Sequence, residues 1–176
     1  DPAHAGFSIQ TGEIRARGVE LQAHASLTDE LSVIASYTYT NAINTKSSTT
    51  DVTIDGDVVS TQGKHPTAVP EHMASLWANY TFHDGPARGL GLGAGVRYVG
   101  SSYGDAANSF EVPGFTLFDA ALQYDLGEVA PSLQGRRRQL KSTNLCEKSY
   151  VSSCVGQESC YYGLRRTVLA TRTYNW

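Results

Sequence analysis

The stretch from Leu90 to Val99, LGLGAGVRYV, decides the fold. Apolar side chains occupy its even-numbered positions up to 98, and glycine or arginine occupies the odd-numbered positions from 91 to 97. A repeat of two is that of a β-strand, because successive side chains of a strand point to opposite faces of the sheet. Three glycines at alternate positions weaken a strand interior, so they indicate that another group crowds their face. The stretch therefore predicts a strand with one apolar face and one crowded face.

Segments with the same alternation occur on both sides of this stretch, and turn-rich gaps separate them. The predicted strands are residues 19–27, 31–40, 73–82, 90–98, 115–124, about 138–151 and 167–176. The pattern is poorest in the sixth of these segments. No segment of useful length has a helical period. The chain is therefore predicted to be all-β, with about seven antiparallel strands.

The connections between the predicted strands alternate in length. Short turns follow the first, third and fifth strands, and long polar loops follow the others; residues 44–70 form one such loop, with a hairpin tip expected at residues 55–57. A soluble β-sandwich would also alternate along its strands, but unequal connections are typical of a transmembrane β-barrel. Aromatic residues near strand ends fit the girdle of such a barrel: Tyr80, Phe82, Tyr98, Tyr124, Tyr174 and Trp176.

Composition excludes several classes of function. The 176 residues carry a net charge of −3, which gives no reason to expect nucleic acid as a partner. The five histidines lack metal-ligand spacing, and no serine lies in a Gly-x-Ser-x-Gly elbow, so we expect neither a metal site nor an enzyme. Residues 1–4 lack the basic and apolar regions of a signal peptide, which predicts a mature form or a fragment.

Three cysteines occur, at positions 146, 154 and 160. Cys154 and Cys160 lie six residues apart in a Ser/Gly-rich stretch, and such a short loop suits a disulfide in an oxidising compartment. Free thiols remain an alternative. A zinc site is the weaker rival, because no histidine lies nearby and two thiolates do not complete a zinc shell.

Two longer stretches carry a family resemblance. Residues 12–20, GEIRARGVE, and residues 96–110, VRYVGSSYGDAANSF, resemble segments of TonB-dependent ferric-siderophore receptors of the ferrichrome or hydroxamate type. Supporting matches are residues 70–73, 143–145 and 147–151. The resemblance covers essentially the whole chain.

The resemblance implies a fold, a function and partners. Receptors of this family have a 22-stranded barrel whose lumen is plugged, and a plug would supply the crowding expected beside the three glycines. They take up a ferric siderophore through the outer membrane with energy from the TonB complex, which contacts the N-terminal part of the protein. Residues 1–176 then form a C-terminal portion of the barrel without the plug.

The expected partners are the siderophore, outer-membrane lipid and the barrel-assembly machinery. The aromatic end Tyr174 to Trp176 resembles the recognition signal of that machinery; no cofactor is implied. The alternative is a truncated or stand-alone β-rich binding module without transport activity.

The family binds hydroxamate siderophores through aromatic side chains and a few hydrogen-bond donors in the extracellular mouth. The candidates are Tyr103, Phe110, Tyr161 and Tyr162, although such residues also build aromatic girdles. Val155 stands where ferrichrome-type receptors can carry an aromatic contact, which argues against ferrichrome itself.

Charged positions on the strands have two interpretations. The lumen-facing set could pair with a plug, but solvated lumen charges are the preferred interpretation: Glu20, Gln22, His24, Arg97 and Asp119. Other positions depart from the family pattern on neighbouring strands: Arg136, Arg137, Arg138, Cys146 and Arg172. A lipid-facing arginine costs ~2–4 kcal/mol at the bilayer midplane and less near the interface, so we expect Arg136, Arg138 and Arg172 to reach the headgroups. Alteration, degeneration or a sequence not under barrel selection would each explain why the departures cluster.

Overall fold

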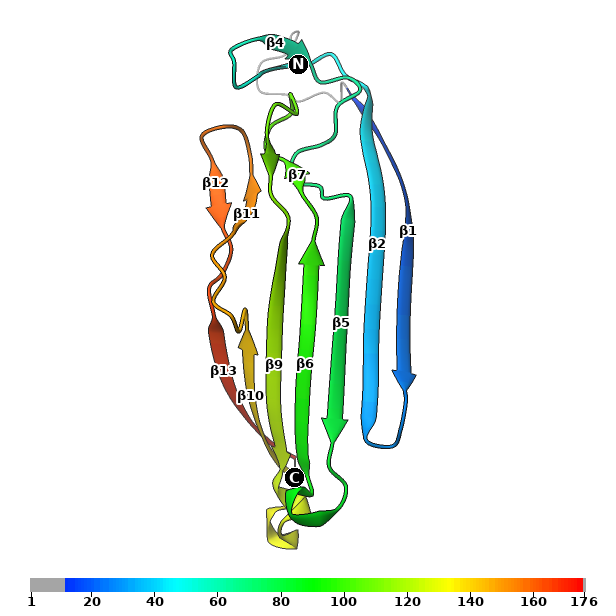
Figure 1. Ribbon diagram of the computed structural model, residues 1–176, viewed down its shortest axis with the longest axis vertical. Helices are drawn as coiled ribbons and strands as arrows, with labels where there is room; N and C mark the ends of the chain where they lie inside the picture. The colour runs from blue at the N-terminus through cyan, green and yellow to red at the C-terminus, as the bar shows by residue number, and fades with distance from the viewer. Residues whose placement is uncertain (1–11, 176) are drawn as a thin grey trace.

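The computed structural model describes residues 12–175, and most of them form one open antiparallel sheet (Figure 1). Its seven strands follow the order β1-β2-β5-β6-β9-β10-β13, so each pairs with its neighbours along the chain. Their bounds are β1 Glu13–Ser26, β2 Leu31–Lys46, β5 His72–Thr81, β6 Leu90–Val99, β9 Phe115–Asp125, β10 Arg136–Thr143 and β13 Thr167–Tyr174. The prediction of an all-β, seven-stranded antiparallel wall is confirmed. In the described range, helix is confined to the 3₁₀ turns Gly85–Ala87, Leu126–Glu128 and Pro131–Leu133, and none is long and apolar enough to cross a membrane.

The register places the apolar residues of neighbouring strands on one face, the outer face. Leu92 of β6 pairs with Tyr80 of β5 and Leu122 of β9, and Val96 pairs with Phe118 in the same way. Cross-strand partners share a face, so these side chains form one continuous apolar surface. Leu92 is 44% exposed and Phe118 is 50% exposed, so the outer face packs on no core within the described chain. A lipid-facing wall has this property.

The opposite, inner face explains the glycines of β6. Trp77 of β5 lies over them: a Cβ added at Gly93 would stand 2.4 Å from its Cζ2 atom, and one added at Gly95 would stand 2.4 Å from its Cε3 atom. Neither contact is possible for a real side chain, so glycine is required at both positions. The predicted crowding is present, and a tryptophan of the adjacent strand supplies it here.

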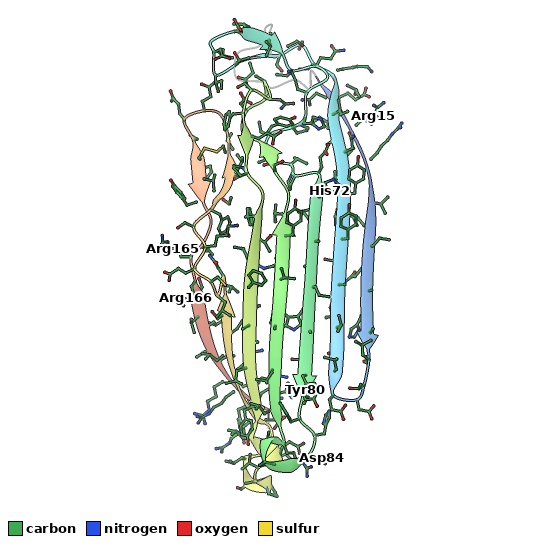
Figure 2. All side chains as sticks on the ribbon, in the orientation of Figure 1. Arg15, His72, Tyr80, Asp84, Arg165 and Arg166 are labelled. Carbon is green, nitrogen blue, oxygen red and sulfur yellow. A yellow bond between two sulfur atoms is a disulfide. The ribbon has the colours of Figure 1, made fainter. Side chains whose placement is uncertain are left out.

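The two ends of the sheet differ as the connections predict. The short turns lie at one end, called the short-turn end, and Figure 2 shows Tyr80 and Asp84 there. The long loops lie at the other, the long-loop end (Figure 1). Each long loop contains a small hairpin: β3 Thr50–Val52 with β4 Val58–Ser60, β7 Ser102–Tyr103 with β8 Glu111–Val112, and β11 Val151–Cys154 with β12 Cys160–Tyr162.

The predicted extent of the sixth strand, residues 138–151, is wrong. β10 begins at Arg136 and ends at Thr143, because Asn144 adopts a left-handed backbone with φ 52°. Its side-chain amide donates to the carbonyls of Lys148 and Leu164 at 2.8 and 3.1 Å, and its amide oxygen accepts from the Lys148 N–H at 2.8 Å. Asparagine tolerates this conformation and bonds the backbone locally, so it ends the strand.

Both edges of the sheet are unpaired in the described chain. β1 pairs only with β2, and β13 pairs only with β10. Every residue of these two edge strands is exposed. An open edge of this length offers a row of unpaired backbone groups to another strand, so the sheet has the form of a barrel segment and not of a closed barrel.

Candidate functional site

The three long loops are joined to one another at the long-loop end of the sheet. We call residues 47–71, 100–114 and 144–166 together the loop platform. Asp105, which is 1% exposed, organises the second loop: its carboxylate accepts bonds from the N–H of Ser109, at 2.8 Å, and from its hydroxyl. The Ser109 hydroxyl in turn accepts the Ile54 N–H of the first loop at 3.0 Å, and the Asp51 carboxylate accepts the Ala107 N–H at 3.0 Å.

A second clamp ties the same two loops. The side chain of Asn108 accepts the backbone N–H of His65 at 2.7 Å and donates to its carbonyl at 2.9 Å. The Ala68 N–H donates to the carbonyl of Tyr103 at 2.9 Å. Each of these bonds joins residues more than thirty positions apart in the sequence, so the two loops form one layer and not two separate loops.

The third loop joins this layer at its hairpin. The side-chain amide of Gln157 donates to the carbonyl of Val52 at 3.0 Å, and the Gly156 N–H donates to the carbonyl of Gly104 at 2.8 Å. The hairpin itself is closed by the predicted disulfide between Cys154 and Cys160, which the structure contains. The prediction of a bridge in preference to free thiols or zinc is therefore confirmed. Cys146 is a free, exposed thiol.

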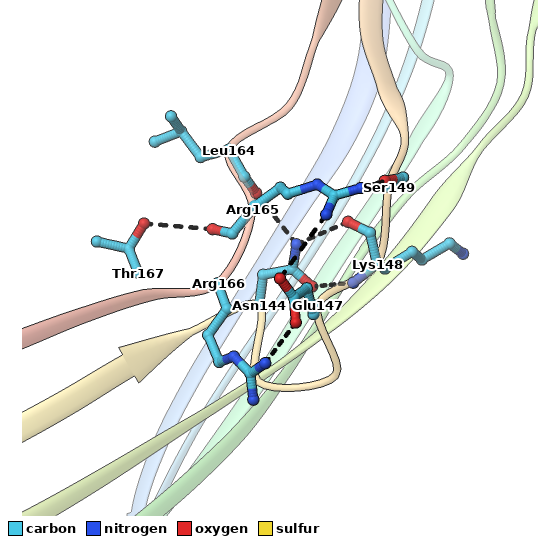
Figure 3. Close-up of polar contacts among 8 residues, drawn as sticks. All are labelled: Asn144, Glu147, Lys148, Ser149, Leu164, Arg165, Arg166 and Thr167. Carbon is cyan, nitrogen blue, oxygen red and sulfur yellow. Dashed lines mark hydrogen bonds and ion pairs between the residues drawn. The ribbon is translucent and has the colours of Figure 1, made fainter.

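The base of the third loop is a polar neck, shown in Figure 3. The Glu147 carboxylate binds the guanidinium of Arg166 and lies 3.7 Å from that of Arg165. Arg165 also donates to the Ser149 hydroxyl at 2.7 Å. These contacts hold the two strands of the loop together where they leave the sheet, and Figure 2 shows both arginines at that level.

The sequence-predicted ligand residues fall into two groups. Tyr103 stacks on the His65 ring, with centroids 5.5 Å apart, and it lines a pocket of about 180 Å³. Phe110 packs against Gly104, where an added Cβ would stand 2.1 Å from the phenyl ring. Both aromatic residues therefore contribute to packing within the platform.

The other three candidates lie on the disulfide-closed hairpin. Val155, Tyr161 and Tyr162 are 61%, 59% and 80% exposed. Tyr161 pairs with Ser153 across the hairpin, and Tyr162 pairs with Val151. The hairpin thus presents two tyrosines and a valine to solvent at the rim of the platform.

An ion pair below the platform was not predicted. The guanidinium of Arg97 donates to both carboxylate oxygens of Asp119, at 2.6 and 3.0 Å, and Asp119 is 8% exposed. Asp119 also accepts the buried Asn144 N–H at 2.9 Å, which connects the wall to the neck. The preferred interpretation of these two residues as separate solvated lumen charges is therefore wrong. The sequence pattern places both residues on the inner face. Asp119 lies opposite Gly95 in the register and not opposite Arg97, so the two side chains meet diagonally, and only the register shows that they are close enough to bond.

The ion pair lies in an inner-face pocket of about 490 Å³. Trp77, Leu117 and Tyr150 line its apolar part, and Lys141 also lines it. Within residues 12–175, no three His, Cys, Asp or Glu side chains gather as a metal site would require.

Trp176, part of the predicted assembly signal, lies outside the described residues; Tyr174 is the penultimate aromatic of that signal and ends β13.

Comparisons with known proteins agree with this architecture. A family model described as TonB dependent receptor-like, beta-barrel, matches residues 2–140. The ferrichrome outer membrane transporter/phage receptor of Escherichia coli K12 is 48% identical over 176 residues, which are 100% of this chain and 22% of that protein. The ferrioxamine receptor of Yersinia enterocolitica is 40% identical over 172 residues, 98% of this chain and 22% of that protein.

Solved structures show the same fold. The siderophore receptor PiuA from Acinetobacter baumannii has a TM-score of 0.73 at 26% identity, over 93% of this chain and 22% of that one. The ferric citrate transporter FecA matches with a TM-score of 0.73 at 24% identity, over 93% of this chain and 24% of that one, and shows the fold alone. The chain thus spans 22% of the length of the curated relatives above, which are transporters and receptors rather than enzymes. It belongs to the TonB-dependent receptor family, as a segment of the β-barrel wall in the outer membrane.

Proposed function

We propose that the chain forms part of the wall and outer mouth of a receptor that takes up ferric hydroxamate siderophores. One observation carries the proposal: three long loops are bonded into a single platform at one rim of a membrane-spanning wall. Long loops of outer-membrane barrels lie on the extracellular side, where a ligand first meets the receptor. The relatives named for ferrichrome and ferrioxamine, two hydroxamate siderophores, support the substrate class.

The exposed hairpin supplies the contacts in this proposal. A ferric hydroxamate complex is bulky and rich in carbonyl oxygens, so it suits aromatic faces and hydroxyl donors. Tyr161 and Tyr162 offer both on a hairpin whose shape the disulfide restrains, and Val155 adds an apolar contact. Tyr103 and Phe110 sit deeper in the platform, where they would contact a ligand only from below.

The remaining partners follow from the family. Energy from the TonB complex would enter through parts of the receptor that precede this wall segment. The outer face would contact membrane lipid, and the barrel-assembly machinery would recognise the last strand with Tyr174 and Trp176. The ferric siderophore is cargo, and the proposal needs no resident cofactor.

Uptake by the full-length receptor tests the proposal. Cells that depend on this receptor are given ferric ferrichrome, ferric ferrioxamine B or a ferric catecholate, each labelled with radioactive iron. We expect uptake of at least one hydroxamate and none of the catecholate, with at least a tenfold weaker ligand affinity in the Tyr161→Ala/Tyr162→Ala variant. Val58→Ala, at an exposed valine of the first loop and outside the disulfide-closed hairpin, serves as the control and should leave uptake unchanged. Catecholate uptake without hydroxamate uptake would refute the substrate class.

The alternative, a stand-alone binding module, is less well supported. Within residues 12–175 each edge strand has one unpaired edge, and the outer face is apolar. A water-soluble module would have to cover both features. A monodisperse, folded chain in detergent-free buffer would favour that alternative.

A further inference from the structure

Three arginines gather on the outer face, near the short-turn end of the wall. Arg138 of β10 pairs directly with Arg172 of β13 and, on its other side, with Tyr124 of β9. Arg136 pairs with Tyr174 two positions nearer the turn. Tyr124 pairs with Leu90, so the whole group belongs to the lipid-facing side of the sheet.

The depth of this group in the membrane follows from its register. Arg138 is the third residue of β10, and Tyr124 precedes by one residue the Asp125 that ends β9. At about 3.4 Å per residue, the arginines lie within roughly 10 Å of the turn. Tyrosines of a barrel wall mark the interface between acyl chains and headgroups, and two tyrosines lie here. The guanidinium groups are therefore at headgroup level on the short-turn side, which is the periplasmic side of an outer-membrane barrel.

Within residues 12–175, two of these charges have no anion beside them. Among the described residues, neither Arg138 nor Arg172 has an ion pair or a side-chain hydrogen bond, and like charges directly opposite one another destabilise a sheet. The nearby acids are occupied on other surfaces. Asp125 pairs with the inner-face Arg137 at 3.3 Å, and Glu128 binds Arg88 at 2.6 Å. Arg136 lies over the Tyr174 ring, 5.4 Å from its centroid, so its charge is held at the edge of the group.

A groove runs along the wall from the arginine pair toward the membrane centre. Its volume is about 410 Å³, and its apolar outer-face lining comes from Leu122, Leu140 and Ala170, with Arg138 and Arg172 at its end. Leu140 pairs with Ala170 and with Leu122, and the small alanine leaves the depression. An apolar depression that ends at two cations without an anion suits the first part of an acyl chain below a negatively charged headgroup.

We propose that Arg138 and Arg172, with Arg136 beside them, form a binding site for an anionic glycerophospholipid of the periplasmic leaflet. The phosphodiester accepts from both guanidinium groups, which present planar forks suited to phosphate. Its single negative charge lies between the two cations and reduces the repulsion of the Arg138–Arg172 pair. The first segment of one acyl chain lies in the groove over Leu140 and Ala170. The site accounts for arginines at lipid-facing positions that would otherwise weaken the wall.

Lipid titration of the full-length receptor tests the site. The purified receptor, folded in a zwitterionic detergent, is titrated with phosphatidylglycerol or phosphatidylcholine, and bound lipid is counted by native mass spectrometry. A basic residue near a membrane surface strengthens binding of anionic lipid about fivefold, so Arg138→Gln/Arg172→Gln should weaken phosphatidylglycerol binding about 25-fold. Phosphatidylcholine carries the same phosphodiester but no net charge, so it should bind the wild type more weakly and lose less affinity than phosphatidylglycerol in this variant.

Matched variants separate this site from general charge effects. Arg88→Gln/Arg137→Gln also removes two charges at the short-turn end, from positions that already pair with acids, and should keep the wild-type affinity. Arg138→Lys/Arg172→Lys should keep most of it. Folding is checked by the heat-dependent gel mobility of the barrel; if the double glutamine variant does not fold, Arg172→Gln alone should lose about fivefold. Equal phosphatidylglycerol affinity in the glutamine and control variants would overturn the proposal, as would an equal loss for phosphatidylcholine.

Discussion

Replacement of Asp119 by alanine should loosen the base of the third loop while it leaves the wall in place. The carboxylate accepts three bonds, two from Arg97 and one from the Asn144 N–H. Asn144 is 2% exposed, so its N–H would lose its partner without gaining water. An unsatisfied buried donor costs about 1–3 kcal/mol, and loss of hydrogen bonds to a charged group costs about 1.5–3 kcal/mol. Because Arg97 is half exposed and can be rehydrated, we take the lower half of the range for its lost hydrogen bonds.

The expected sum is about 3–4 kcal/mol in the free energy of local opening. At about 1.4 kcal/mol per factor of ten, this changes the opening equilibrium constant at least a hundredfold. Hydrogen–deuterium exchange of the full-length receptor measures it directly: amides of residues 144–150 should exchange about a hundredfold faster in Asp119→Ala. Exchange in the β6 and β9 interior should stay within a few-fold of the wild type.

The control variant is Asp125→Ala, which removes another aspartate of the same strand. Asp125 pairs with Arg137 and accepts the Gly127 N–H at the short-turn end. Its loss should speed exchange near residue 127 and leave residues 144–150 unchanged. If Asp119→Ala changes exchange at residues 144–150 by less than about threefold, the ion pair does not hold the neck and the reasoning fails.

Three further predictions concern the crowded face, the hairpin and the short turn. Gly95→Val should reduce the yield of folded receptor severalfold, since even a Cβ would overlap the indole ring above it, and heat-dependent gel mobility measures that yield. Cys154→Ser/Cys160→Ser should expose the third-loop hairpin to protease, because a bridge across so short a loop contributes about 2–3 kcal/mol to its order; protection equal to the wild type would contradict this. The Thr28 hydroxyl, which donates to the Glu30 carboxylate at 2.7 Å, lowers the pKa of that carboxyl, so Thr28→Val should raise the pKa measured by NMR titration. Because the pKa of Glu30 is lower in the folded state, ionised Glu30 stabilises the turn fully at pH values above the ordinary glutamate pKa. This stabilisation is lost as the pH falls through the lowered pKa.

Period-two alternation was sufficient to predict the wall. The strand at residues 90–98 was found almost to the residue, because one face is apolar throughout and a shift of one position would reverse it. The strands at residues 19–27 and 31–40 were predicted too short, since β1 begins at Glu13 and β2 continues to Lys46. Their extra residues lie at the long-loop end, where Arg15 and Arg17 occupy the positions of β1 that continue the apolar series of Val19 and Leu21, so the apolar repeat stops before the strand does.

What the sequence did not predict depends on contacts between distant segments. The end of β10 is set by the side chain of Asn144, whose partners include a carbonyl twenty residues away. The Arg97–Asp119 bond requires the register of two strands, and the platform requires bonds such as that between Gln157 and Val52. Period and composition carry no information about these pairings. The disulfide, by contrast, joins cysteines six residues apart and was predicted from their spacing.

The nearest-neighbour order of the sheet has a consequence for how such a wall assembles. Each pairing from β1 to β13 joins strands that adjoin in the chain, so every step closes only a turn or one long loop and has a small entropic cost. Assembly of this segment can therefore proceed hairpin by hairpin without waiting for distant strands. If further strands completed a barrel in the same order, only the pairing of the first strand with the last would join segments far apart in the chain. That single pairing would carry the large entropic cost of closing the barrel. Within residues 12–175 the exposed edges of β1 and β13 are where further strands would add, and a substitution there would delay that addition without disturbing the strands already paired.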